Sequence, residues 1–133
     1  MTIEENKQVV LRFNKEFLET GNTEVLKEIV ADTFTNHTAA ANSPKDISGI
    51  IQFITVLHKR FSDLSIQIHE LIGEDDTVAA RKTITARHTG EIMGHMPTGK
   101  KVIMNVIEIV FLKDGKYTDH WSRNDIMQVI QGL

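Results

Sequence analysis

The spacing of hydrophobic residues changes once along this chain, near residue 64. Before this point, apolar residues recur every three or four positions, which is the spacing of one face of a helix. From Leu64 onward they alternate with polar residues, as in strands with one buried face. Helices followed by strands predict an α+β fold in which the helices pack on one face of a curved antiparallel sheet. No repeat or linker interrupts the 133 residues, so we expect a single domain over residues 1–133.

Three helices are predicted in the first half from their boundary signals. Thr2 and Glu5 form a capping-box pattern at the start of the first helix. The second helix is expected over residues 24–30, followed by a short extended piece over residues 33–37. The third is expected to use Ser43 as its N-cap and Pro44 as its first residue. A short helical turn is expected at the C-terminus.

Four longer strands are predicted in the second half, over residues 64–73, 77–88, 101–112 and 117–124. An Asp114-Gly115 turn joins the last two as a hairpin. The strand over 101–112 is apolar on both faces, which implies burial on both sides. Since the helices can cover only one face of the sheet, we expect a homodimer through its outer face, with Trp121 contributing to the contact.

Charge and composition narrow the range of partners. The net charge is -3, and residues of both signs are scattered along the chain. A nucleic-acid or anionic-membrane surface would instead show a clustered basic face, so neither partner is expected. There are no cysteines, which excludes disulfides and thiol chemistry. The N-terminus lacks the basic flank and apolar run of a signal peptide, so we expect a cytoplasmic protein.

Several short motifs fall where the predicted strands begin and end. They are Asn36-His37, His88-Thr89-Gly90-Glu91, Gly94 with Met96-Pro97-Thr98-Gly99-Lys100, and Asp114-Gly115-Lys116 with Asp119-His120-Trp121 and Asp125. Together with the helix and strand order, the chain resembles the SnoaL-like polyketide cyclase or ester cyclase family of the nuclear transport factor 2-like superfamily. The resemblance implies a cone-shaped α+β barrel with three N-terminal helices, open at one end. In different relatives the interior pocket holds polyketides, steroids or other small apolar molecules, and dimerisation through the sheet is common.

The resemblance also points to positions in the pocket. An aspartate on the last strand of the aldol-condensing cyclases falls at Ser122, and a glutamine and a histidine of the preceding strand fall at Val106 and Glu108. A serine cannot act as an acid or base at neutral pH. The resemblance therefore supports the fold more strongly than it supports polyketide cyclase activity.

Glu108, His120 and Ser122 are the candidate catalytic residues. Glu108 could act as a general base if it faces the pocket, and His120 would lie near it across the hairpin as an acid/base partner. Alternatively, Glu108 pairs across a dimer interface or hydrogen bonds to Ser122 or His120, and the histidine is simply half-buried. A shift of one residue in strand register would turn Glu108 outward and exclude the catalytic interpretation.

Five further residues are candidates for ligand binding. Met104 and Val106 would form an apolar wall. His88 could orient a carbonyl group, or could hydrogen bond to the loop that follows it. His37 could close the pocket mouth, or could be solvated. Asp125 could reach the pocket, although it also matches an N-cap of the terminal helix.

No metal or other cofactor is expected, because no pair of histidines has ligand spacing on one helix or strand. Two classes of function fit the sequence. One is a cofactor-independent enzyme that isomerises, cyclises or hydrolyses a small apolar carbonyl compound. The other is a non-catalytic module that binds a small ligand or serves to dimerise. Buried ionisable groups in the pocket would favour the enzyme, whereas a wholly apolar pocket would favour the binding module.

Overall fold

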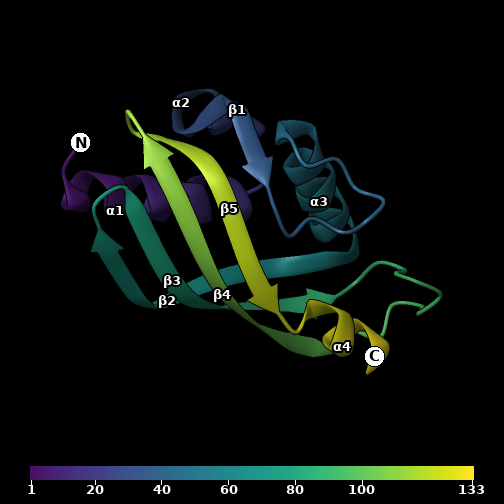
Figure 1. Cartoon of the computed structure of the whole chain (residues 1–133). Coiled ribbons are helices and arrows are strands. Elements are labelled where there is room, and N and C mark those ends of the chain that lie inside the picture. Colours follow the sequence, from purple (N-terminus) through teal and green to yellow (C-terminus); the bar gives the residue numbers. More distant parts are fainter.

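The structure, a computed structural model that describes residues 1–133, places helices against one face of a strongly curved sheet (Figure 1). The strands are β1 Val30–Asn36, β2 Phe61–Glu74, β3 Thr77–His88, β4 Lys101–Lys113 and β5 Lys116–Asn124. They lie in the order β1-β5-β4-β3-β2, which leaves the sheet unclosed with β1 and β2 at its edges. The predicted α+β class, with helices on one side of a curved sheet, is confirmed.

One strand pairing differs from the antiparallel sheet expected from the sequence. β1 runs parallel to β5, while the other three pairings are antiparallel. β1 also begins earlier than expected, because the short α2 helix Leu26–Ile29 ends before Val30. Val30 and Phe34 are buried, so the start of this segment belongs to the core as a strand. Parallel pairing places the end of β1 beside the middle of β5.

The α1 helix, Ile3–Arg12, begins with the predicted capping box. The Glu5 backbone N–H donates to Thr2 Oγ1 at 3.0 Å, and the Thr2 N–H donates to the Glu5 carboxylate at 3.1 Å. The helix then widens into a π-helical turn over Phe13–Leu18. Such turns redirect side chains relative to a regular α-helix, and here the polar side chain of Asn14 is fully buried among core residues.

The α3 helix, Ile47–Arg60, starts later than predicted. Its N-cap is Asp46, whose carboxylate accepts a hydrogen bond from the Ser48 N–H at 3.0 Å, so the prediction of a cap at Ser43 was wrong. Pro44 lies outside the helix, and its carbonyl oxygen would be 2.1 Å from a Cβ placed at Gly49. The segment before α3 therefore folds over the first turn of the helix, and only glycine allows this approach.

The β4 strand alternates strictly between buried and exposed side chains. Even-numbered residues, including Met104 and Val110, face the helices and the core. On the outer face, Ile103, Ile107, Ile109 and Phe111 are 55%, 58%, 43% and 41% exposed. The expected burial of both faces is therefore not met within one chain.

The hairpin between β4 and β5 has the predicted turn and one irregularity. Asp114 and Gly115 have φ values of 51° and 77°, as a two-residue turn of type I′ requires. Leu112 pairs with Tyr117 and Phe111 with Asp119, so β5 has one extra residue between these pairs. This β-bulge lets Tyr117 and His120 face the same side of the sheet.

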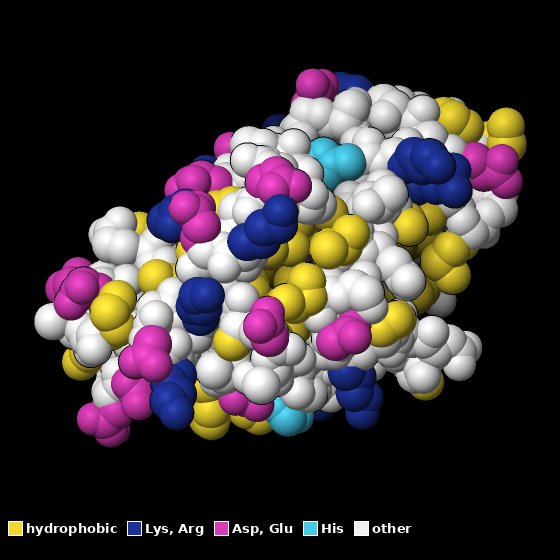
Figure 2. Space-filling model, turned by 90° about the horizontal axis from the view of Figure 1, so that it is seen from above, with side chains coloured by type: hydrophobic (Ala, Val, Ile, Leu, Met, Phe, Trp, Pro, Cys, Tyr) yellow, Lys and Arg dark blue, Asp and Glu magenta, His cyan; other side chains and the backbone are white.

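The short α4 helix, Ile126–Gln131, ends the fold beside β4. No helix has the length and apolar character needed to cross a membrane. In the view of Figure 2, acidic and basic side chains are interspersed, and hydrophobic side chains gather in the hollow between them.

Candidate functional site

A cavity of about 460 Å³ lies between the inner face of the sheet and the helical layer. Aromatic and aliphatic residues form most of its wall, and many of them, such as Phe13, Phe17 and Ile130, come from the helices. Most of its polar groups come from neighbouring strands, namely Asn36, Lys82, Glu108, His120, Ser122 and Asn124; Thr38 and Ser43 come from the segment after β1. An apolar cavity with a few convergent polar groups is the usual form of a small-molecule site.

A buried ion pair lies at the sheet side of this cavity. The Lys82 ammonium contacts Oε2 of Glu108, and the two side chains are only 4% and 0% exposed. Lys82 Nζ also donates a hydrogen bond to Asn14 Oδ1 at 2.6 Å. Asn14 is itself fixed, because its Nδ2 donates to the Val10 carbonyl at 2.9 Å. The π-helical turn thereby holds the ion pair from the helical side.

The other oxygen of Glu108 has no donor from the protein. Oε1 is buried without a hydrogen-bond partner and lies 4.0 Å from Nε2 of His120. The opposite ring nitrogen of His120, Nδ1, lies 3.1 Å from Asn36 Oδ1. Since Oδ1 also accepts from the Thr38 N–H, it is an acceptor, and His120 Nδ1 must carry the proton. Nε2 of neutral His120 then presents a lone pair toward Glu108.

Burial lowers the pKa of His120 below its usual value of 6.5. The positive charge of Lys82 acts in the same direction, while Glu108 opposes them. His120 is therefore neutral at neutral pH. Glu108 Oε1 and His120 Nε2 are two acceptors that face each other without a proton donor between them.

Tyr117 and Ser122 complete the polar surroundings. The Tyr117 hydroxyl is fully buried without a partner, and its ring stacks on Phe13 with centroids 4.6 Å apart. Burial and the nearby charge of Glu108 raise the pKa of this hydroxyl well above its usual range. Ser122 pairs directly with Glu108 in the register of β4 and β5 and lines the cavity. The predicted set of Glu108, His120 and Ser122 is thus brought together on one face.

Three of the residues expected to bind a ligand are buried, but only one of them lines the cavity. Val106 lines the cavity, whereas Met104 is completely buried and lies outside its lining. His88 is also fully buried outside the lining. Its Nδ1 accepts from the Thr98 N–H at 3.2 Å and lies 3.0 Å from Thr98 Oγ1. The structure therefore places His88 as an anchor of the loop that follows β3.

His37 lies outside the cavity lining, contrary to its expected place at the pocket mouth. Its Nε2 lies 2.8 Å from Asp119 Oδ1, and its ring stacks on Trp121 with centroids 4.3 Å apart. The hydrogen bond to His37 lowers the pKa of Asp119. Asp119 and Trp121 pair with outward-facing residues of β4, so His37 belongs to the outer surface.

Asp125 also lies outside the cavity lining, and its side chain does not cap α4 as predicted. Its carboxylate accepts hydrogen bonds from the Asn105 backbone N–H at 2.7 Å and from Nδ2 at 2.9 Å. This pair of bonds fixes the chain after β5 to the outer side of β4. His37, His88 and His120 thus have separate partners, and the structure brings together no group of three or more His, Asp or Glu side chains in a metal-binding arrangement.

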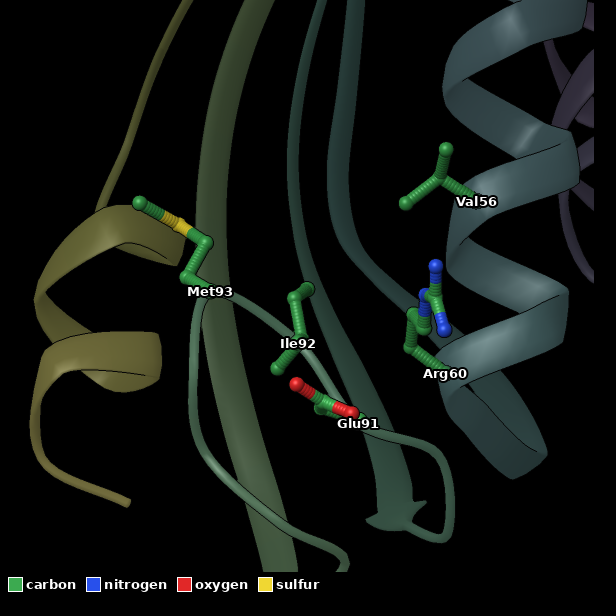
Figure 3. Close-up of a pocket in the computed structure, with 5 residues that line it drawn as sticks. All are labelled: Val56, Arg60, Glu91, Ile92 and Met93. Atoms are coloured by element: carbon green, nitrogen blue, oxygen red, sulfur yellow. The ribbon is translucent and has the colours of Figure 1, made fainter.

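A second, more open depression of about 380 Å³ borders the cavity. Figure 3 shows Val56 and Arg60 on α3 facing Glu91 and Ile92 of the loop after β3. Val56 and Ile92 also line the larger cavity, so the depression is continuous with its wall. Arg60 and Glu91 form no ion pair with each other, and the buried charges all lie in the larger cavity.

Sequence reasoning missed Lys82 and Asn14. A signal for Lys82 was present, because it falls at an inward position of the alternating run that includes Ala80 and Ile84. A lysine at such a position requires a buried counter-charge, and β4 supplies only Glu108 on its inner face. Asn14 had no such signal, because a π-helical turn does not follow the regular helical period.

The chain belongs to the SnoaL-like polyketide cyclase family, whose model matches residues 8–133. This family defines a class of small α+β proteins with the fold described above. A search of functionally curated proteins found no match.

Three solved structures illustrate the similarity of fold. TsrD from Streptomyces laurentii is 21% identical with a TM-score of 0.86, and the match covers 100% of this chain and 99% of that one. A candidate polyketide cyclase from Acidithiobacillus ferrooxidans is 25% identical with a TM-score of 0.84, covering 100% and 97%. A candidate polyketide cyclase from Bacillus cereus is 27% identical with a TM-score of 0.82, covering 96% and 78%.

The buried ion pair predicts strongly non-additive effects of mutation. Lys82→Met should lower the free energy of unfolding by about 3–5 kcal/mol, because it leaves the Glu108 carboxylate buried without a counter-charge. The double variant Lys82→Met/Glu108→Leu should lose less than Lys82→Met alone. Urea unfolding of the single and double variants measures this coupling.

The exposed Arg81 and Glu70 pair, with both side chains 52% exposed, provides a matched control. Arg81→Met should cost no more than about 1 kcal/mol, since solvent screens this pair. Additive losses in the Lys82 and Glu108 variants would contradict the structure.

His120 predicts a pH dependence of stability. Because its pKa is lower in the folded state, the unfolded state binds more protons as the pH falls below about 6.5. The free energy of unfolding should therefore decrease from pH 6.5 downward. His120→Asn, which can still donate to Asn36, should reduce this slope, whereas the exposed control His69→Asn should not. Equal slopes in the wild type and His120→Asn would exclude His120 as the cause.

Proposed function

We propose that this protein binds a small apolar carbonyl compound in the cavity and moves a proton on it without a cofactor. The observation that carries the proposal is a pair of acceptors: Glu108 Oε1, which is buried without a donor from the protein, and His120 Nε2, which lies 4.0 Å from it. Unsatisfied acceptors at a cavity wall are costly, and an acidic C–H or O–H of a ligand can be placed between them. The catalytic role of this pair is our inference from its geometry.

In this mechanism Glu108 takes a proton from the carbon next to the carbonyl group. Lys82 acts as a positioning residue, since its contact with Oε2 holds the carboxylate in place and leaves Oε1 free. The lone pair of His120 Nε2 accepts the proton from Glu108, and the protonated ring then donates it to the ligand at another atom. Both groups are desolvated, so they act without competition from bulk water.

Ser122 is suited to hydrogen bonding rather than to proton abstraction. Its place opposite Glu108 would allow its hydroxyl to donate to the carbonyl oxygen, where negative charge develops as the proton leaves. This role replaces the one expected of His88, whose Nδ1 is occupied by Thr98. The outcome for the ligand would be an isomerisation, or a cyclisation if the enolate attacks a second carbonyl group.

A binding protein without catalysis is the second candidate function. It is favoured by the largely apolar cavity wall and by serine at position 122, where the resemblance places an aspartate. The two candidates differ in whether a bound carbonyl compound is altered. Analysis of the products therefore distinguishes an enzyme from a binding protein.

Proton exchange with solvent tests the catalytic proposal directly. We expect the protein to accelerate deuterium uptake at the α-carbon of 2-tetralone in D₂O, measured by mass spectrometry. Glu108→Gln should reduce this acceleration about 10²–10⁴-fold, because the general base is lost. Glu70→Gln, at an exposed glutamate on β2, is the matched control.

Native mass spectrometry with a panel of polyketide, steroid and terpenoid carbonyl compounds extends the test. A compound that binds and is recovered unchanged, with no α-exchange in 2-tetralone, would support the binding protein instead. Exchange that is undiminished in Glu108→Gln would remove Glu108 from the mechanism.

We further propose that the protein forms a homodimer through the outer face of the sheet. The four exposed apolar residues of β4 form a stripe, and Trp121 extends it by an edge contact with Phe111 at 4.8 Å between centroids. Outward-facing Arg81, Asp119 and Arg123 surround this stripe with charges of both signs. Such a surface can complement a second copy of itself across a two-fold axis.

Light scattering tests the dimer. Ile107→Lys should convert a dimeric wild type to a monomer, because the substitution buries a charge at the centre of the interface. Val56→Lys replaces an exposed apolar residue of similar size on α3, on the helical side, and should leave the mass unchanged. A monomeric wild type at micromolar concentration would contradict the proposal.

A further inference from the structure

Lys82 is the only lysine that lines the cavity. It is also the only buried lysine in the chain; the others are partly or fully exposed. Its Nζ has two neighbours, Asn14 Oδ1 at 2.6 Å and Glu108 Oε2 in closer contact. A primary amine is therefore held at the wall of a cavity large enough for a small molecule, beside a carboxylate that can exchange protons with it.

The contact with Glu108 provides a route to the nucleophilic form of the amine. A lysine reacts with a carbonyl group only after it loses a proton, and a neighbouring base can accept that proton. Transfer from Nζ to Oε2 changes a buried ion pair into a neutral amine and a neutral carboxylic acid. This transfer removes two buried charges at once. Its free-energy cost is therefore smaller in the apolar surroundings than it would be in water.

We propose that Lys82 forms an imine with carbonyl ligands of the cavity, an inference that rests on the proposed carbonyl-binding function. After Glu108 has taken the ammonium proton, the Nζ lone pair attacks the carbonyl carbon. A proton moves from nitrogen to oxygen, which gives a carbinolamine. The Glu108 carboxylic acid then protonates the hydroxyl group, the C–O bond breaks and water leaves. The products are a protonated imine on Lys82, the Glu108 carboxylate and one water molecule.

The charge balance of this reaction fits the site. The protonated imine carries the same positive charge as the original ammonium, at the same nitrogen, so the ion pair with Glu108 is restored. The reaction therefore replaces one buried ion pair with another and leaves no uncompensated charge. The imine also withdraws electrons from the neighbouring carbon, and His120, which lines the same cavity, would accept a proton from it.

Reductive trapping tests the proposal in the wild-type protein. The protein is incubated at neutral pH with cyclohexanecarbaldehyde and sodium cyanoborohydride, which reduces imines to stable secondary amines. Peptide mapping by mass spectrometry then gives the labelling rate of each lysine. We expect Lys82 to be labelled about 10-fold or more faster than the exposed Lys27 and Lys59, because binding places the aldehyde beside it.

Variants separate chemistry from simple access. Glu108→Gln should slow the labelling of Lys82 about 10-fold or more, because the group that protonates the carbinolamine hydroxyl before water leaves is lost, while Glu70→Gln should not change it. Labelling of Lys82 no faster than that of Lys27 and Lys59 in the wild type would overturn the proposal, as would unchanged labelling in Glu108→Gln.

Failure of this proposal is distinguishable from failure of the proposed function. If native mass spectrometry shows that the aldehyde binds but Lys82 is not trapped, the imine is excluded. Deuterium exchange in 2-tetralone that depends on Glu108 would then still support acid/base catalysis. If no carbonyl compound binds and no exchange is accelerated, both proposals fail.

Discussion

The contacts of Lys82 with Glu108 and Asn14 link the two layers of this protein. Lys82 and Glu108 come from different strands, and the ammonium is held from the helical side by Asn14. Two charges removed from water are tolerated only when their partners are placed accurately, so this pair constrains the distance between the π-helical turn and the sheet. The same constraint leaves one oxygen of Glu108 without a donor, next to His120. The interaction that supports the packing of the helices on the sheet thus also leaves a carboxylate oxygen available for chemistry.

Much of the fold follows from local signals in the sequence. The capping box at Thr2 and the Asp114-Gly115 turn are set by residues within a few positions of each other, and both form as predicted. The period of two in β4 places Glu108 inward, because its neighbours at even positions are all apolar. The site residues on β4 and β5 were found for this reason: alternation along a paired strand determines which face each side chain occupies.

The remaining features depend on contacts that no local pattern describes. Asp46, rather than the predicted Ser43, caps α3. Both residue types are good N-caps, and the fold of the preceding loop determines which of them does so. His37 lies on the outer surface because its ring stacks on Trp121, more than eighty residues later in the chain. The parallel direction of β1 and the burial of Asn14 depend on packing in the same way.

The β-bulge in β5 makes the inner and outer surfaces dependent on each other. Because of the extra residue, Tyr117 and His120 face inward, while Asp119 and Trp121 face outward. Regular pairing from Tyr117 onward, with no bulge, would place Thr118 opposite Phe111 and Asp119 opposite Val110, and the two sets would exchange. An imidazole and an indole would then swap sides, and the cavity and the aromatic outer surface would change in a single step. Evolution of the ligand site and of the outer surface in this chain is therefore coupled through the register of one strand.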